Sequence, residues 1–125
     1  MSETAGAHVR RRRRILRTCF ALALAVVAVL LLLPSDELPD TGIWDKFEHA
    51  LTFAVLALLG TAAFPERRHN WWLAFGLIGF GATCEILQTW VPGRSVSFAD
   101  GLANAIGVLV TIVAVALFRK WTKPH

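Results

Sequence analysis

Charged residues are scarce in this sequence. Of its 125 residues, 13 are Lys or Arg and 9 are Asp or Glu, so that 18% of the chain is charged; soluble domains carry about 25%. Apolar residues make up 55% of the chain, and the mean hydropathy is +0.53. This composition excludes an ordinary cytosolic enzyme and an intrinsically disordered chain. The length predicts a single domain, residues 1–125, with no room for a second.

Cysteine is also scarce, which excludes two further classes of protein. Cys19 and Cys84 lie singly inside apolar stretches. The sequence therefore has neither a disulfide framework nor a CxxC pair for a structural metal site. We expect no cofactor and no metal. The pI is near 9.8, but the positive charges gather at the edges of the apolar stretches, as in membrane proteins, so we expect no nucleic-acid partner.

Four apolar stretches predict an all-α integral membrane bundle. They run over about 15–33, 47–64, 71–90 and 98–118. Each is about 18–21 residues long, which is the length that a helix needs to cross a hydrocarbon core of about 30 Å. Backbone polar groups find no water in lipid, so we expect four transmembrane helices after a basic N-terminal tail, residues 1–14. A cleaved signal peptide is the alternative for the first stretch, but no small-x-small site follows it.

The distribution of positive charge predicts the orientation in the membrane. If the chain crosses four times, eleven of the thirteen Lys and Arg residues lie on one side, and only Lys46 and Arg94 lie on the other. Lys and Arg mark the cytoplasmic side, so both termini are expected in the cytoplasm. All five tryptophans fall at predicted helix ends, where indole rings favour the headgroup zone. We therefore expect a multi-pass protein of the cell membrane, with the lipid bilayer as its partner.

Small residues mark the surfaces on which these helices are expected to pack, because lipid offers no hydrophobic drive between helices. The first stretch has no polar group beyond its first turn, so we expect it to pack peripherally. A small four-helix protein also leaves much lipid-facing surface, which favours self-association into a homo-oligomer. The small residues that we expect at helix contacts are Ala50, Ala54, Gly76, Gly79, Gly81, Ala103 and Gly107.

Polar residues gather in one layer of the predicted bundle. An ionisable group at bilayer depth costs a few kcal/mol and usually serves a function. Helix direction alternates, so the start of the second stretch, the end of the third and the start of the fourth all lie at the outer face. We therefore expect these three helices to form a polar pocket that opens outward. The residues of this layer are Glu48, His49, Glu85, Gln88, Asp100 and Asn104.

The segment between the third and fourth stretches adds two polar residues to this layer. Pro92-Gly93 predicts a turn. Arg94 can return into the acidic cluster or contact lipid phosphate at the headgroups. Ser97 stands three residues before Asp100, which is the spacing of a helix capping box and gives both residues a purely structural interpretation.

The other polar residues have structural interpretations too. Asp45 and His49 have the i, i+4 spacing of a surface pair at a wet helix end. Glu48 can extend outward to water, and Asn104 can serve as an interhelical hydrogen-bonding residue. Taken singly, each structural interpretation is favoured, but the cluster as a whole favours a functional site.

Two segments of the chain resemble the VanZ-like family of membrane proteins. Asp45-Lys46-Phe47-Glu48-His49 with Phe53 is similar to the D-K-x-x-H-x-x-x-F opening of that family. The similarity extends to its E-x-x-Q, P-x-R and D-x-x-x-N-x-x-G signature, in Glu85-Ile86-Leu87-Gln88, Pro92-Gly93-Arg94 and Ser97, and Asp100 with Asn104-Ala105-Ile106-Gly107.

This resemblance covers about half of the chain, from Asp45 to Gly107. It implies a small multi-helix membrane protein, and the namesake of the family is associated with resistance to the glycopeptide teicoplanin. It assigns no biochemical activity. Some relatives carry a phosphotransbutyrylase label, which is not supported here, because no phosphate-binding glycine loop is visible.

Two functional hypotheses follow for the polar layer. In the first, a membrane enzyme acts on a cell-envelope or lipid-linked molecule; His49 is the general acid or base, tuned by Asp45 or Glu85, and Arg94 holds a phosphate or carboxylate. In the second, a non-catalytic module binds lipid, glycopeptide or a partner protein. The candidate catalytic residues are His49, Glu85 and Asp100, and the candidate binding residues are Asp45, Lys46, Glu48, Gln88, Arg94, Ser97 and Asn104.

Two further interpretations have less support. A divalent cation among Asp45, His49, Glu85 and Asp100 has no HExxH-like spacing behind it. A small transporter is the weakest alternative, because the chain has no repeated half and no polar stripe in its cytoplasmic half.

Overall fold

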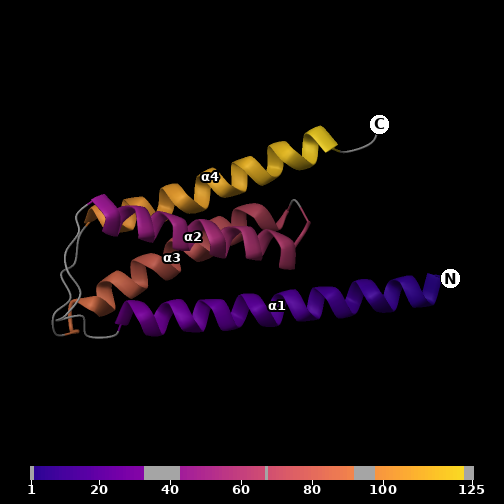
Figure 1. The fold of residues 1–125 in the computed structure, drawn as a ribbon, viewed down its shortest axis with the longest axis horizontal. Coiled ribbons are helices and arrows are strands. Elements are labelled where there is room, and N and C mark those ends of the chain that lie inside the picture. Colours follow the sequence, from indigo (N-terminus) through magenta and orange to yellow (C-terminus); the bar gives the residue numbers. More distant parts are fainter. Residues whose placement is uncertain (1, 33–42, 67, 92–97, 123–125) are drawn as a thin grey trace.

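The computed structural model describes residues 2–32, 43–66, 68–91 and 98–122, and these residues form four α-helices and no strand (Figure 1). The predicted all-α fold class is confirmed. The last three helices lie within a few residues of their predicted bounds. The helices are α1 (Ser2–Leu32), α2 (Ile43–Ala63), α3 (His69–Gln88) and α4 (Phe98–Thr122).

The first helix begins at Ser2, well before the apolar stretch that predicted it. Much of the intervening segment is alanine and arginine, which are strong helix formers. Glu3 lies in the first turn, where a carboxylate interacts favourably with the helix dipole. The basic residues 10–14 are therefore part of one continuous helix, which extends past the turn between α2 and α3 (Figure 1).

Two of the described helices, α1 and α4, are long and apolar enough to cross a membrane. The α2 helix contains a shorter apolar stretch, Phe47–Ala63. Large apolar side chains are exposed on all four helices, among them Val26, Leu51, Phe75 and Val110. Apolar exposure on this scale is unusual for a soluble monomer and typical of a surface that faces lipid. The four-span topology and the position of the termini stay predictions.

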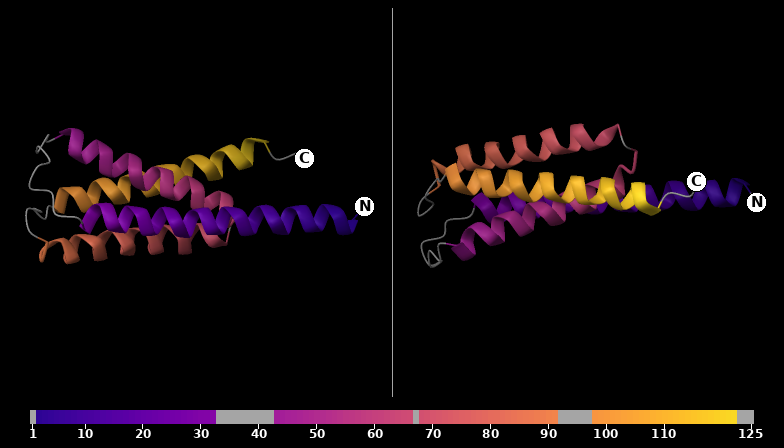
Figure 2. Two further views of the ribbon diagram at one scale, coloured as in Figure 1. Left: turned by 60° about the horizontal axis from the view of Figure 1, so that its bottom comes forward. Right: turned by 90° about the horizontal axis from the view of Figure 1, so that it is seen from above.

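The α2 helix crosses α4, as the left view of Figure 2 shows. It contacts each of the other three helices and packs most extensively against α4, whereas α1 contacts only α2 and α3 among the described helices. This agrees with the expected peripheral place of the first helix. The buried apolar core joins α2, α3 and α4, and consists of Phe53, Leu56, Ala57, Ala74, Leu77, Val108 and Ile112.

Glycines at two positions allow the helices of this core to approach closely. A Cβ atom on Gly107 would lie 2.2 Å from the carbonyl oxygen of Ala50, so the backbones of α2 and α4 are in contact there. A Cβ atom on Gly81 would lie 3.1 Å from the ring of Phe53. Both are contacts that the sequence predicts on the principle that small residues let membrane helices pack.

The same expectation is wrong for Gly76 and Gly79. Both are exposed, and a Cβ atom on either would meet nothing within 4 Å among the described residues. The buried face of α3 instead follows Ala74, Leu77, Gly81, Cys84 and Gln88. This spacing of three and four residues selects one side of the helix, and the two exposed glycines fall outside it.

Two arginines, from the first and last helices, bind the C-terminal end of α2. Arg119 of α4 donates hydrogen bonds of 2.8 Å from Nη1 to the carbonyl of Pro65 and from Nη2 to the carbonyl of Thr61. In an unbroken helix, the amide of residue 65 would donate to Thr61, but proline has no N–H. The guanidinium therefore supplies a donor that the backbone lacks, at the negative end of the helix dipole.

Arg17 of α1 completes this arrangement from the other side. Its Nε donates to the carbonyl of Ala63 at 3.2 Å, and its guanidinium carbon lies 4.7 Å from the centre of the Phe64 ring. Cations over aromatic rings at this distance are attracted by the negative face of the ring. Three carbonyls at the end of α2 thus accept hydrogen bonds from two neighbouring helices.

We expect Arg119→Gln to lower the free energy of unfolding by about 2 kcal/mol, because it removes charged donors and leaves the Thr61 carbonyl without a partner. Lys120→Gln is the matched control, since it removes the same charge from an exposed neighbour in the same turn; we expect a change of less than about 0.5 kcal/mol. Unfolding of the purified protein by sodium dodecyl sulfate in mixed micelles measures both. Equal losses would show that net charge, rather than the two hydrogen bonds, stabilises this end.

Candidate functional site

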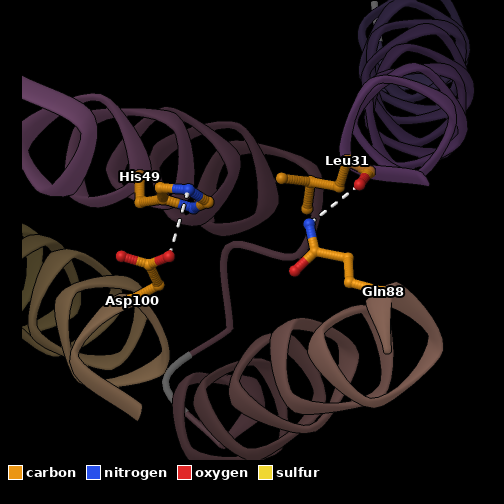
Figure 3. A network of polar contacts seen from close by, with 4 residues as sticks. All are labelled: Leu31, His49, Gln88 and Asp100. Carbon is orange, nitrogen blue, oxygen red and sulfur yellow. Dashed lines mark hydrogen bonds and ion pairs between the residues drawn. The ribbon is translucent and has the colours of Figure 1, made fainter. Parts of the chain in front are cut away.

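The site is built around a polar contact between α2 and α4. Nε2 of His49 and Oδ2 of Asp100 lie 4.0 Å apart, and the two side chains are only 11% and 12% exposed (Figure 3). Asp100 stands in the first turn of α4, where the positive end of the helix dipole favours a carboxylate. His49 precedes Ala50, whose carbonyl meets Gly107. The close approach of the two helix backbones therefore brings the imidazole and the carboxylate together.

Glu85 reaches the same cluster from α3. Its carboxylate accepts a hydrogen bond from the backbone amide of Gly101 and interacts electrostatically with Asp100 and His49. A Cβ atom on Gly101 would lie 2.6 Å from Oε2 of Glu85, so the missing side chain makes room for this carboxylate beside the first turn of α4. The other oxygen, Oε1, is buried without a hydrogen-bond partner among the described residues.

Asn104 lies one helical turn beyond Asp100 on α4 and is 2% exposed. Its Nδ2 atom is 3.3 Å from the place that a Cβ on Gly81 would occupy, so α3 also approaches α4 closely at this level. Its Oδ1 atom is a second buried acceptor without a partner in the described part of the chain. A buried acceptor that lacks a donor costs about 1–3 kcal/mol. The two acceptors therefore favour the binding of a group that donates hydrogen bonds.

The structure thus brings together four of the predicted site residues, His49, Glu85, Asp100 and Asn104, from three helices. Gln88 serves a different contact: its Nε2 donates to the carbonyl of Leu31 at 2.8 Å (Figure 3). This carbonyl belongs to the last turn of α1, where no intrahelical donor remains. Gln88 therefore holds α1 against α3.

The remaining predicted site residues do not join the described cluster. Glu48 is exposed on α2. The side chains of Asp45 and Lys46 lie outside the described residues, as do Arg94 and Ser97. The capping box between Ser97 and Asp100 consequently stays a prediction, whereas the contact of Asp100 with His49 is seen.

Gly101 is a site residue that the sequence analysis missed. Its position gives a signal, since an isolated glycine within a predicted helix often marks a packing or functional constraint. It directly follows Asp100, so it belongs to the same turn as one of the candidate catalytic residues. The carbonyl of Leu31 has no comparable signal, because any residue supplies one.

Among the described residues, no group of three or more His, Cys, Asp or Glu side chains is arranged to hold a metal ion. The divalent-cation alternative also includes Asp45, whose side chain lies outside these residues. The cluster is instead suited to proton transfer, because it places an imidazole beside two carboxylates in a largely desolvated position.

Comparison with known protein families gives one match. The sequence model of the family described as VanZ/LLP1 matches residues 16–119, a segment that includes α2 and α3 entirely and most of α1 and α4. All the candidate site residues fall inside this segment. No match is found among curated proteins or among solved structures.

Proposed function

Because this chain belongs to the VanZ/LLP1 family, we propose that it is a multi-pass membrane protein whose polar cluster acts on a lipid-linked or other cell-envelope molecule at the outer face of the membrane. The observation that carries this proposal is the meeting of His49, Asp100 and Glu85 from three different helices. Ionisable groups within an apolar bundle are costly, so their convergence favours a function over chance.

In this proposal His49 transfers the proton. Imidazole changes its protonation state near neutral pH and can act as a general acid or base. Asp100 faces Nε2 of the ring at 4.0 Å. Glu85, held by the Gly101 amide, places a second carboxyl group beside it. The two carboxylates thus lie beside the ring and orient it.

The substrate would be held by the two buried acceptors, Oε1 of Glu85 and Oδ1 of Asn104. These atoms accept hydrogen bonds, so they complement hydroxyl, amide or ammonium donors. Sugars and peptides of cell-envelope precursors carry such donors. We therefore place the polar head of an envelope molecule, rather than a hydrocarbon chain, beside these two residues.

A non-catalytic binding module is the second candidate function. The observation that favours it is the same pair of unpartnered acceptors, since they explain binding without any proton transfer. In that case the ligand would be a glycopeptide, a lipid headgroup or a partner protein, and His49 would serve only to hold α2 against α4. The two candidates differ in what they require of the imidazole.

The test expresses the protein in a teicoplanin-sensitive bacterium and compares wild type, His49→Gln, Glu85→Gln and the matched control Glu66→Gln, which alters an exposed glutamate in the turn after α2. Teicoplanin susceptibility and the masses of lipid-linked envelope precursors are measured at equal membrane levels. For an enzyme, we expect His49→Gln to reduce the effect about 100-fold or more, to the level of the empty vector. Glu66→Gln should match wild type.

The other outcomes separate the candidates. Loss in Glu85→Gln with wild-type behaviour of His49→Gln would support the binding module and exclude proton transfer by the imidazole. Wild-type behaviour of both variants would exclude the cluster as the functional site. Wild-type protein with the same precursors and susceptibility as the empty vector would contradict the envelope role.

A further inference from the structure

A second polar region lies at the opposite end of the helices and is rich in arginine. It contains two hollows of about 600 and 400 Å³, which share Arg13 and which we call the arginine hollows. The larger runs along α1 and is lined by Arg10, Arg13, Arg14, Arg17, Thr18, Ala21 and Leu22. The smaller lies between α1 and the ends of α2 and α4, and is lined by Val9, Arg12, Arg13, Leu16, Ala62, Pro65 and Arg119.

The charge of these hollows is of one sign. None of the described residues that line them is acidic. Glu66, in the turn after α2, forms an ion pair of 2.7 Å with Arg68. The lining arginines of α1 are exposed. The hollows therefore present a concentrated positive surface to an anionic ligand.

Two of the lining guanidiniums are already held in place. Arg119 is fixed by the carbonyls of Thr61 and Pro65, and Arg17 by the carbonyl of Ala63. A guanidinium carries five N–H donors, of which Arg119 uses two on these carbonyls. Because Arg119 loses little further side-chain entropy on binding, it provides a preorganised contact at the inner wall of the smaller hollow.

The lining of the larger hollow changes in character along α1. Arginines lie toward the N-terminal end, Thr18 follows, and Ala21 and Leu22 are apolar. From Arg13 to Leu22 the helix rises about 14 Å, roughly half of a hydrocarbon core. A ligand that fits this gradient has an anionic head and an apolar chain.

We propose that the arginine hollows bind one anionic phospholipid. Its phosphate lies in the smaller hollow, between Arg12, Arg13 and Arg119, and an acyl chain passes Arg13 into the larger hollow, along Ala21 and Leu22. Arginine binds phosphate through two parallel charge-assisted hydrogen bonds, which makes it more selective than a diffuse positive surface. The inference rests on the proposed function only for the membrane orientation, which puts this end at the cytoplasmic headgroups. It makes no use of the polar cluster.

The test uses the purified full chain in a neutral detergent and measures its melting temperature during titration with lipid. Dioleoylphosphatidylglycerol is the anionic probe, dioleoylphosphatidylcholine the zwitterionic one, and inorganic phosphate the free anion. A ligand that binds the folded state raises the melting temperature in proportion to its occupancy. We expect a saturable rise with the phosphatidylglycerol alone.

Two double variants with the same loss of charge test the location. Arg12→Gln/Arg13→Gln removes two lining residues, whereas Arg11→Gln/Lys120→Gln removes two exposed cations that line neither hollow. We expect the half-saturating concentration of phosphatidylglycerol to rise about tenfold in the first and less than about threefold in the second. Arg13→Lys keeps the positive charge but removes the planar guanidinium that binds phosphate through two hydrogen bonds, so it should weaken binding to an intermediate extent.

Three results would overturn the proposal. Equal weakening in the two double variants would show general attraction to a positive surface. An equal rise with phosphatidylcholine would show that the phosphate charge is not recognised, and an equal rise with inorganic phosphate would make the ligand a free anion. His49→Gln should bind phosphatidylglycerol as wild type does, so failure of this proposal and failure of the proposed function are distinguishable.

Discussion

Replacing Gly107 by alanine is expected to lower the free energy of unfolding by about 2–3 kcal/mol, the largest effect that we expect for Gly→Ala at any described glycine. The added Cβ would lie 2.2 Å from the carbonyl oxygen of Ala50 and 3.0 Å from its carbonyl carbon. Both atoms are backbone, so no side-chain rotation relieves the clash. The helices α2 and α4 must move apart, and the buried residues that pack between them lose contact.

This expected loss of stability must exceed a gain in stability that the same substitution brings. Alanine is favoured over glycine in a helix by about 1 kcal/mol. Gly79→Ala isolates that gain, because a Cβ there meets nothing within 4 Å of the described atoms. We expect Gly79→Ala to leave the protein unchanged or slightly more stable, and Gly107→Ala to unfold at a lower fraction of sodium dodecyl sulfate. Similar stability of the two variants would contradict close backbone packing of α2 on α4.

Replacing Gly101 by alanine is expected to abolish function while changing stability by less than about 1 kcal/mol. The added Cβ would lie 2.6 Å from Oε2 of Glu85, which is the free end of a flexible side chain and can rotate away. The displaced carboxylate would then leave the Gly101 amide and the neighbourhood of His49. We therefore expect teicoplanin susceptibility and envelope precursors to match those of Glu85→Gln.

Gly79→Ala again serves as the control for the methyl group itself. It should keep wild-type function, since Gly79 is exposed and lies away from the buried face of α3. Wild-type function in Gly101→Ala would show that the position of the Glu85 carboxylate is unimportant. A large loss of stability would show that this carboxylate is fixed more rigidly than its single amide contact implies.

Much of the fold follows from apolar length alone. Stretches of about 20 apolar residues predicted four helices, and the structure has them. The start of α1 could not be placed in this way, because residues 2–14 are polar and the apolar pattern says nothing about them. The high helix propensity of arginine favours continuation of the helix through Arg10–Arg14.

The polar layer was predictable because helix direction alternates. The starts of α2 and α4 and the end of α3 must share one level, and the structure places His49, Asp100 and Glu85 there. What the pattern could not decide is which neighbour a side chain selects. Gln88 shares a level with Glu85 but donates to α1, because its position on the helix faces the terminal carbonyl of Leu31.

The sequence also could not predict which glycines lie at close helix contacts. Gly76, Gly79, Gly81 and Gly107 are equal in size, but only the last two lie at close helix contacts. The side of each helix that faces inward depends on the crossing angles between helices, and these angles depend on how the large side chains of all the helices pack. Gly107 is buried because α2 crosses α4 at its level, a property of the pair rather than of either helix.

The arginine that closes the end of α2 has a consequence for biosynthesis. Chain elongation completes α2 long before Arg119 is made, and Pro65 ensures that the Thr61 carbonyl has no backbone donor of its own in the meantime. The end of the second helix is therefore fully hydrogen-bonded only after the last turns of α4 have been synthesised. A ribosome that stalls within the last helix leaves this end of α2 without the hydrogen bonds that Arg119 donates.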